Sequence, residues 1–267
     1  MERWLHNLTT LLRTLVPPHY SWPAIDVRLP GNRQLHLVGS IHMGTRNMMP
    51  LPPGLLARLE KADALIVEAD ITGSASPFSH SAAQPPLAER LDADTLQKLA
   101  RQCAELNLNL AQLDRLPLWQ IALMLQAQQA QRLGLRPDYG IDYQLLQAAH
   151  AQGRRIIELE GADEQLDLLK TLPEEGQSLL ADTLEHWHTN ARLLQTMISW
   201  WLEKPPQPSR PALPTTFSTE LNDLLMSQRN QRWDRLLRQL PPGRYVVAVG
   251  ALHLYGENNL PALLKRR

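Results

Sequence analysis

The sequence of 267 residues contains one cysteine, has no net charge and lacks any long apolar run. The single thiol, Cys103, recurs at helical spacing with Leu99 and Leu106, which predicts that it is buried, and no disulfide can form within the chain. Basic and acidic side chains number 27 each, so no overall field favours nucleic acid or anionic lipid as a partner. No stretch approaches the roughly 18 consecutive apolar residues of a membrane span, so we expect no transmembrane helix.

The first 16 residues also lack the features of a signal peptide, namely an uninterrupted apolar core and a small-residue cleavage site. Leucines recur in this segment, residues 1–16, at three- and four-residue steps, which predicts an amphipathic helix. Such a helix packs on the domain or makes weak contact with a membrane surface. We therefore expect a cytoplasmic protein.

One short pattern is present in two copies. Each copy follows an apolar, β-branched run and places a histidine shortly after a glycine: Gly39 with His42, and Gly250 with His253. A glycine at the end of a strand indicates a turn or a close backbone approach. If the two strands are parallel neighbours, both histidines lie at the same edge of the sheet, where open α/β sheets bind ligands.

Two further short runs are interpreted as strands, and each ends in an acidic residue, Glu68 or Glu160. Imidazole and carboxylate groups are ligands that zinc, manganese and cobalt accept in proteins. His42, His253 and Glu68 would hold such an ion and leave one position open for water, whose pKa the ion lowers. Without a metal, a histidine paired with Glu68 could act as general base. The chain has no compact motif such as His-Glu-x-x-His, so the prediction depends on these strand ends coming together.

The order of the expected elements predicts an α/β fold, with a mainly parallel central sheet, an N-terminal hairpin and extensive helical insertions. We expect the hairpin over residues 25–38, where two alternating runs flank turn residues. The helical insertions are expected at about 87–135 and 162–240, within a single domain over residues 1–267.

Three other segments have distinct patterns. Apolar residues repeat at three- and four-residue steps over residues 182–201, which predicts one amphipathic helix. His186 and His188 lie within it with side chains pointing in different directions, so they are interpreted as structural. Residues 71–86 lack periodicity and are expected to form a surface loop, and prolines between residues 205 and 214 predict an extended connector.

Further motifs accompany the two glycine-histidine copies. They are Val67-Glu68, Gly140-Ile141-Asp142, Leu159-Glu160 with Gln165, and Arg229-Asn230. Together these features resemble the TraB/GumN family, which is related to the Tiki proteases and more distantly to erythromycin-esterase-like and ChaN-like proteins. The resemblance extends from about Gln34 to Leu264, and Ser40 stands where relatives often have threonine.

The resemblance implies a parallel-sheet core with helical additions and a metal-dependent hydrolase site built on the two motifs and Glu68. It also makes Asp142, Glu160, Arg229 and Asn230 site residues, although Arg229 and Asn230 would otherwise be taken for a solvated helix face. Glu160 or Asp142 would assist in activating water, and Arg229 would stabilise developing negative charge. Many relatives are secreted, lipid-anchored or membrane-bound, and this sequence shows no such signal, so their protein or peptide substrates are not carried over.

We therefore expect a metal-dependent, peptidase-like hydrolase in which His42, Glu68 and His253 hold a divalent ion, either manganese, cobalt or zinc. Gly39 and Gly250 are the expected contacts of this cofactor. Two alternatives fit the same residues. A non-catalytic protein could sequester a peptide or a cofactor such as haem through the histidines, and a metal-free, esterase-like hydrolase could use His42 as its base. The substrate, a peptide or a small molecule, is not defined by the sequence, and no nucleic-acid partner is expected.

Overall fold

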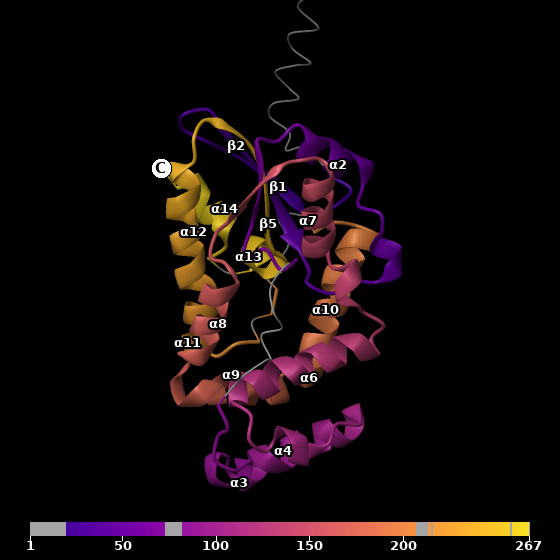
Figure 1. Cartoon of the computed structure of the whole chain (residues 1–267), viewed down its shortest axis with the longest axis vertical. Helices are drawn as coiled ribbons and strands as arrows, with labels where there is room; N and C mark the ends of the chain where they lie inside the picture. The colour runs from indigo at the N-terminus through magenta and orange to yellow at the C-terminus, as the bar shows by residue number, and fades with distance from the viewer. Residues whose placement is uncertain (1–19, 73–81, 207–212, 215, 257, 267) are drawn as a thin grey trace, which may run out of the picture.

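The computed structural model describes residues 20–72, 82–206, 213–214, 216–256 and 258–266. Across these residues, five strands form one sheet in the order β1-β2-β5-β3-β4 (Figure 1). β1 and β2 form the expected antiparallel hairpin, and the other neighbouring pairs are parallel. The strands are β1 (Ala24–Leu29), β2 (Arg33–Ser40), β3 (Ala64–Val67), β4 (Arg155–Glu158) and β5 (Gly243–Gly250). The α/β class and the mainly parallel sheet confirm the predicted fold.

Helices cover both faces of this sheet, as is usual for parallel strands. Side chains alternate along each strand, so Val246 belongs to the same core cluster as Leu55, whereas its neighbour Val247 belongs to that of Trp233. The covering helices are α2 (Pro53–Glu60) and α7 (Ile141–Ala151) on one face, and α12 (Gln228–Gln239) and α14 (Leu260–Lys265) on the other.

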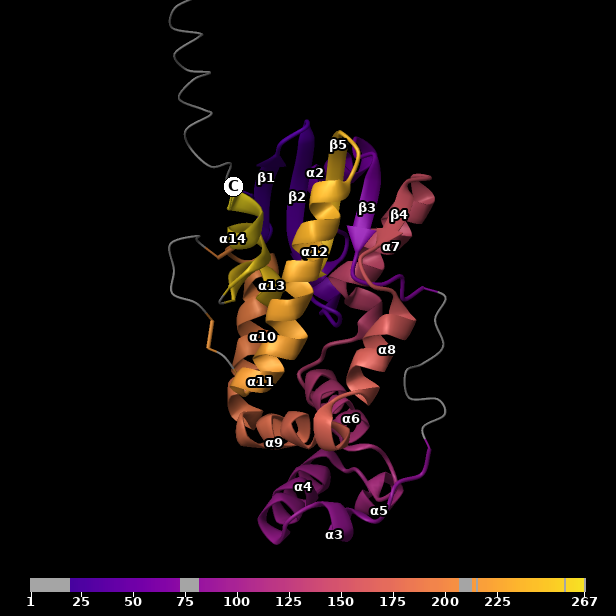
Figure 2. The ribbon, with the colours of Figure 1, turned by 90° about the vertical axis from the view of Figure 1, so that its left-hand side faces the viewer.

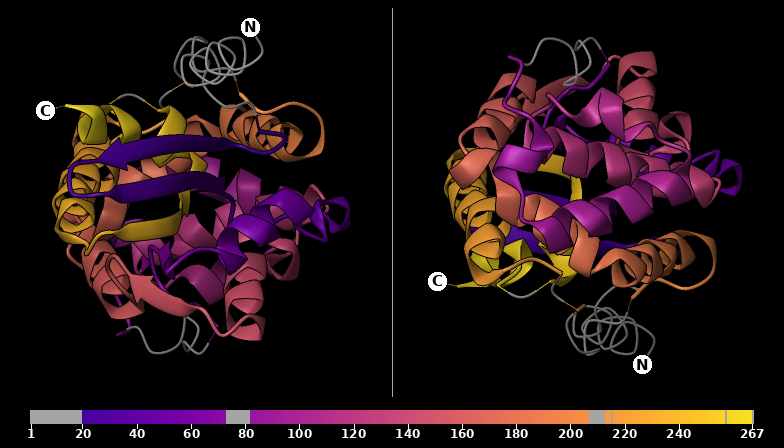
Figure 3. Two further views of the ribbon diagram at one scale, coloured as in Figure 1. Left: turned by 90° about the horizontal axis from the view of Figure 1, so that it is seen from above. Right: turned by 90° about the horizontal axis from the view of Figure 1, so that it is seen from below.

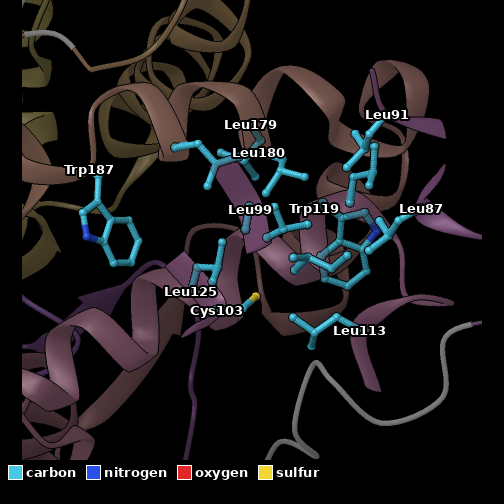
Figure 4. Packing of buried hydrophobic residues seen from close by; sticks show 14 of the residues in the cluster. Leu87, Leu91, Leu99, Cys103, Leu113, Trp119, Leu125, Leu179, Leu180 and Trp187 are labelled. Atoms are coloured by element: carbon cyan, nitrogen blue, oxygen red, sulfur yellow. The ribbon is translucent and has the colours of Figure 1, made fainter. Parts of the chain in front are cut away.

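Most of the other helices form a layer beyond the carboxyl ends of the parallel strands (Figures 2 and 3). Its own apolar core gathers many leucines around Trp119, Trp187 and Cys103 (Figure 4). Cys103 is buried, as its helical spacing predicted. The helices of this layer are α3 (Leu87–Arg90), α4 (Ala93–Leu106), α5 (Leu110–Leu113), α6 (Leu118–Arg132), α8 (Ala162–Lys170), α9 (Gln177–Glu185), α10 (Trp187–Leu202) and α11 (Thr219–Asn222).

The single helix expected over residues 182–201 is wrong, because α9 and α10 divide this segment at His186. α10 begins in the core of the helical layer at Trp187, but its later residues pack against another core. Leu180 of α9 lies in the cluster of the helical layer, whereas Met197 and Trp201 of α10 pack against the cluster under the sheet. The chain therefore changes direction at His186 although the apolar spacing continues across it (Figure 2).

Some expectations concern segments that the structure leaves undescribed. The amphipathic helix expected over residues 1–16 lies outside the described residues, as do residues 73–81 of the expected loop and residues 207–212 of the expected connector. Of the helices that the structure does describe, none combines the length and the apolarity needed to cross a membrane.

Candidate active site

The carboxyl ends of β2 and β5 lie side by side because these strands are parallel neighbours. The twin motifs led us to expect neighbouring strand ends, and Ser40, the last residue of β2, is in register with Gly250, the last residue of β5. His42 and His253 follow these ends, and both line one cleft. β3 pairs with the other side of β5 and ends just before Glu68, which lines the same cleft.

The cleft has a volume of about 370 Å³ and lies between this sheet edge and the helical layer. Its wall at the sheet is polar, whereas its other walls are mainly aliphatic. The apolar lining comes from Leu123 of α6, Leu168 and Leu169 of α8, Leu179 of α9, Met197 of α10, and from Phe217, Leu225, Met226 and Leu252. A largely apolar pocket with a few convergent polar groups is the usual form of a small-molecule or substrate site.

His253 lies in the short helix α13 (Ala251–Tyr255), which begins directly after β5. Its Nδ1 lies 2.7 Å from Oδ1 of Asn230. The Asn230 amide nitrogen donates to the carbonyl of Asn258, so Oδ1 is an acceptor and the imidazole proton is assigned to Nδ1. Burial lowers the pKa of His253 to about 4, so the ring is neutral at pH 7 and its Nε2 carries a free electron pair.

His42 is held in a similar way but is far more accessible. Its Nδ1 lies 2.8 Å from Oδ2 of Asp142, and its side chain is 68% exposed whereas that of Asp142 is 11% exposed. Asp142 belongs to the first turn of α7. The negative charge of Asp142 raises the pKa of His42 to about 9. The contact fixes the orientation of the ring and leaves Nε2 as the nitrogen available to a ligand.

Only a glycine fits at position 140, two residues before Asp142, and Gly140→Ala is therefore expected to destabilise the fold. An alanine Cβ would lie 2.3 Å from the carbonyl oxygen of His42, a clash that only a backbone shift relieves. Urea denaturation should show a loss of about 1–3 kcal/mol, and the shift would separate His42 from Asp142. Gly250→Ala is the matched control, because its nearest contact, to Glu68, would be an ordinary 3.4 Å. Equal losses in the two variants would contradict this explanation.

Glu68 is a buried carboxylate with partners for both oxygens. Oε1 accepts the backbone N–H of Gly250 at 2.7 Å, and Oε2 accepts from Nη2 of Arg229 at 2.6 Å. Burial opposes ionisation, but the charges of Arg229, His253 and His42 and the Gly250 N–H outweigh it and lower the pKa of Glu68 to about 2. Glu68 is therefore negatively charged at neutral pH.

Arg229, in the first turn of α12, lies among the buried acids. Its Nε and Nη2 donate to the two oxygens of Glu160, each at 2.9 Å, which is the bidentate geometry of a strong ion pair. The guanidinium also lies 4.6 Å from the ring centre of Trp233. Glu160 accepts further hydrogen bonds from Arg232 and from the Trp233 indole, and its side chain is only 1% exposed. Glu160 therefore holds Arg229 in place.

The two glycines expected beside a cofactor lie in different surroundings. The Gly250 N–H points at Glu68 on the wall of the cleft. Gly39 instead permits close packing, since a Cβ there would lie 3.2 Å from the ring of Tyr255. Its carbonyl accepts a hydrogen bond from the Trp201 indole at 3.1 Å. Only Gly250 of the pair is thus among the described residues that line the cleft.

Three further residues contact these side chains; Gln165 was noted only as part of a family motif, and Arg232 and Trp233 were not expected at the site. Arg232 and Trp233 follow Arg229 at helical spacing, so α12 places all three on one side, and this spacing is the signal that could have identified them. Gln165 donates from Nε2 to both Glu68 and Glu160, at 3.3 and 3.4 Å. The structure thus brings together all the side chains expected at the site and adds these three.

Comparison with known proteins agrees with the motifs. A model described as the TraB/PrgY/gumN family matches residues 25–267, and the chain belongs to this family. The chain is 57% identical over 261 residues to "Uncharacterized protein YbaP" of Escherichia coli (strain K12), covering 98% of this chain and 99% of that protein. The protein of the same name from Shigella flexneri is also 57% identical over 261 residues, with the same coverage. No solved structure matches the chain. The family resemblance stated from the sequence is confirmed.

The chemistry of the donor set fits a divalent ion. His42 and His253 each have Nδ1 beside an oxygen acceptor, which leaves Nε2 as a ligand, and Glu68 supplies a negative charge. Within the part of the chain that the structure describes, no three His, Cys, Asp or Glu side chains already surround one point as an ion requires. Arg229 instead contacts two of the expected ligands, with Nη2 at 2.6 Å from Glu68 and Nη1 at 3.3 Å from Nε2 of His253.

Proposed function

We propose that this protein is a metal-dependent, peptidase-like hydrolase in which His42, Glu68 and His253 hold a divalent ion. One observation carries the proposal: two imidazoles from neighbouring strand ends, each held at Nδ1 by a second side chain, lie on one cleft with an ionised carboxylate. Outer partners of this kind orient metal-bound histidines in many proteins. Manganese, cobalt and zinc all accept this mixture of nitrogen and oxygen ligands.

A bound ion would supply a water of lowered pKa and would polarise the bond to be hydrolysed. The protein's own groups account for orientation and charge. Asp142 and Asn230 fix the rings of His42 and His253, and Arg229 provides a cation beside the cleft for developing negative charge. Glu160 is engaged by three donors from α12, which suits it to anchoring Arg229 better than to accepting a proton.

The proposed substrate is a peptide or another small molecule, and the proposed location is the cytoplasm. An aliphatic group of the substrate would lie against the apolar walls of the cleft, while the bond to be hydrolysed faces the sheet edge. The cleft of about 370 Å³ accommodates a short segment rather than a folded domain.

Metal binding is the direct test. Calorimetric titration of metal-free protein with Mn²⁺, Co²⁺ and Zn²⁺ should show one class of site. Removal of a ligand by His253→Ala or His42→Ala should weaken binding by at least about 100-fold, more than the 10- to 100-fold typical of an outer partner such as Asn230. Binding should also weaken as the pH falls below about 9, the pKa of His42, because a protonated imidazole cannot ligate and the ion must then displace the His42 proton.

The control is His188→Ala, which removes an exposed imidazole outside the cleft and should leave affinity unchanged. Failure of the folded wild-type protein to bind any of the three ions near neutral pH would contradict the metal-dependent proposal. The protein should be prepared without a polyhistidine tag, since such a tag would itself bind these ions.

A metal-free, esterase-like hydrolase is the second candidate, and the observation in its favour is the accessible His42 imidazole backed by Asp142. A pKa of about 9 keeps this ring protonated at neutral pH, which suits a general acid rather than the base that this mechanism needs. Turnover that persists after complete removal of metal would favour this candidate over the metal-dependent one.

A further inference from the structure

Arg229 occupies the side of the site where two expected metal ligands meet. Its Nη2 lies 2.6 Å from Oε2 of Glu68, and its Nη1 lies 3.3 Å from Nε2 of His253. Both atoms are the ones that an ion would need from these residues, because Oε1 of Glu68 is taken by Gly250 and Nδ1 of His253 by Asn230. The guanidinium thus occupies one face of the expected ligand set.

The same guanidinium has a second, independent set of contacts. Two of its nitrogens pair with Glu160, Nη1 also donates to the carbonyl of Leu225, and the group stacks over Trp233. None of these contacts depends on Glu68 or His253. Arg229 can therefore release these two residues while its charge remains compensated by Glu160.

The charges around Arg229 affect how a divalent cation could bind. The two buried acids, Glu68 and Glu160, are paired with two guanidinium groups, those of Arg229 and Arg232. A divalent cation bound here would lie beside a buried guanidinium. The two cations would repel each other strongly, because little water is present at a buried site to screen their charges. Any ion bound by Glu68 must compete with a cation that is already in place.

We propose that Arg229 is a built-in competitor of the metal ion: its contacts to Glu68 and His253 must be given up when an ion binds, while its contacts to Glu160 are kept. This inference rests on the proposed function and adds how metal affinity is set. Arg229 lowers that affinity and keeps the buried acids paired while the site is empty. The ion should therefore be exchangeable rather than permanently bound.

The test compares the affinity for Mn²⁺ and Co²⁺ of the wild-type protein with those of Arg229→Gln and Arg229→Lys. Arg229→Gln removes the competing charge and should bind about 10- to 100-fold more tightly. Arg229→Lys keeps a positive charge beside Glu160 but lacks the guanidinium group that contacts Glu68 and His253 together. Its affinity for the ion should therefore lie between those of the wild-type protein and Arg229→Gln. Arg235→Gln is the matched control: it removes an equal charge from an exposed position of α12 outside the cleft, and should change affinity by less than about threefold.

A second measurement on the wild-type protein covers the case in which Arg229→Gln does not fold. Because Arg229 stacks on Trp233 and shares Glu160 with its indole N–H, metal binding should shift the Trp233 indole signal in an NMR spectrum, assigned with Trp233→Phe. Wild-type binding that neither shifts this signal nor tightens in the folded Arg229 variants would overturn this inference alone. If neither the wild type nor any variant binds an ion, the proposed function fails and this inference fails with it.

Discussion

Replacement of Glu68 by glutamine is expected to lower hydrolytic turnover by about 10²- to 10⁴-fold while the protein stays folded. Glutamine has nearly the same size and can still accept the Gly250 N–H through its amide oxygen. It cannot supply the charge needed to hold a divalent ion or accept a proton from water. A pKa of about 2 means that the wild-type carboxylate carries this charge throughout the neutral range. The measurement is the rate on peptides or esters that a library screen shows the wild-type protein to hydrolyse.

The matched control is Glu164→Gln, since Glu164 is a half-exposed acid that pairs with Arg232 outside the cleft. This variant should keep wild-type turnover, and circular dichroism and thermal unfolding should show both variants folded. A folded Glu68→Gln variant with full turnover would remove Glu68 from catalysis. A wild-type protein that binds a peptide or haem without ever converting any substrate would place the sequestering alternative first.

Glu160→Ala is expected to lower the free energy of unfolding by about 3–5 kcal/mol, the cost of breaking a buried ion pair on one side only. Glu160 is almost fully buried and accepts from Arg229, Arg232 and Trp233. Its removal leaves Arg229, itself only 13% exposed, with Glu68 as its remaining carboxylate. Urea denaturation of Glu160→Ala should be compared with Glu164→Ala, whose surface ion pair should contribute about 0–1 kcal/mol. Similar losses in the two variants would show that Glu160 does not hold the site together.

The pH dependence of unfolding tests the same ion pairs. Burial opposes ionisation of Glu160, but hydrogen bonds and charge from Arg229, together with the hydrogen bond from Arg232, lower its pKa below the ordinary value of 4.5. A carboxylate whose pKa is lowered by folding stabilises the fold fully above its unfolded pKa, and this contribution is lost as the pH falls. The difference in stability between wild type and Glu160→Ala should therefore be largest near neutral pH and shrink below about pH 4. A difference that is unchanged by acid would contradict an ionic role.

The strand ends show how far the site could be predicted from the sequence. Apolar runs define β2, β3 and β5, and the alternation with helices predicts that these strands are parallel. Parallel strands end at one edge, so a histidine or acid placed just after each run must lie near the others. His42, Glu68 and His253 could be assigned to one edge on these grounds, and the family resemblance added Asp142, Glu160, Arg229 and Asn230 as candidates for the site.

The pairing of those side chains follows from the packing of helices on the sheet and could not be predicted from the sequence. α12 contacts strand ends that are distant in the sequence. Its Asn230 lies beside His253, and its Arg229 donates to both Glu68 and Glu160. The angle and height at which a helix packs on a sheet determine such contacts, and helical periodicity specifies neither. The division of residues 182–201 into α9 and α10 has the same cause, since one continuous apolar pattern serves two separate cores. Local spacing thus determined which edge carries the candidate site, and the packing of helices on that edge determined its hydrogen bonds, its charges and the apolar walls of its cleft.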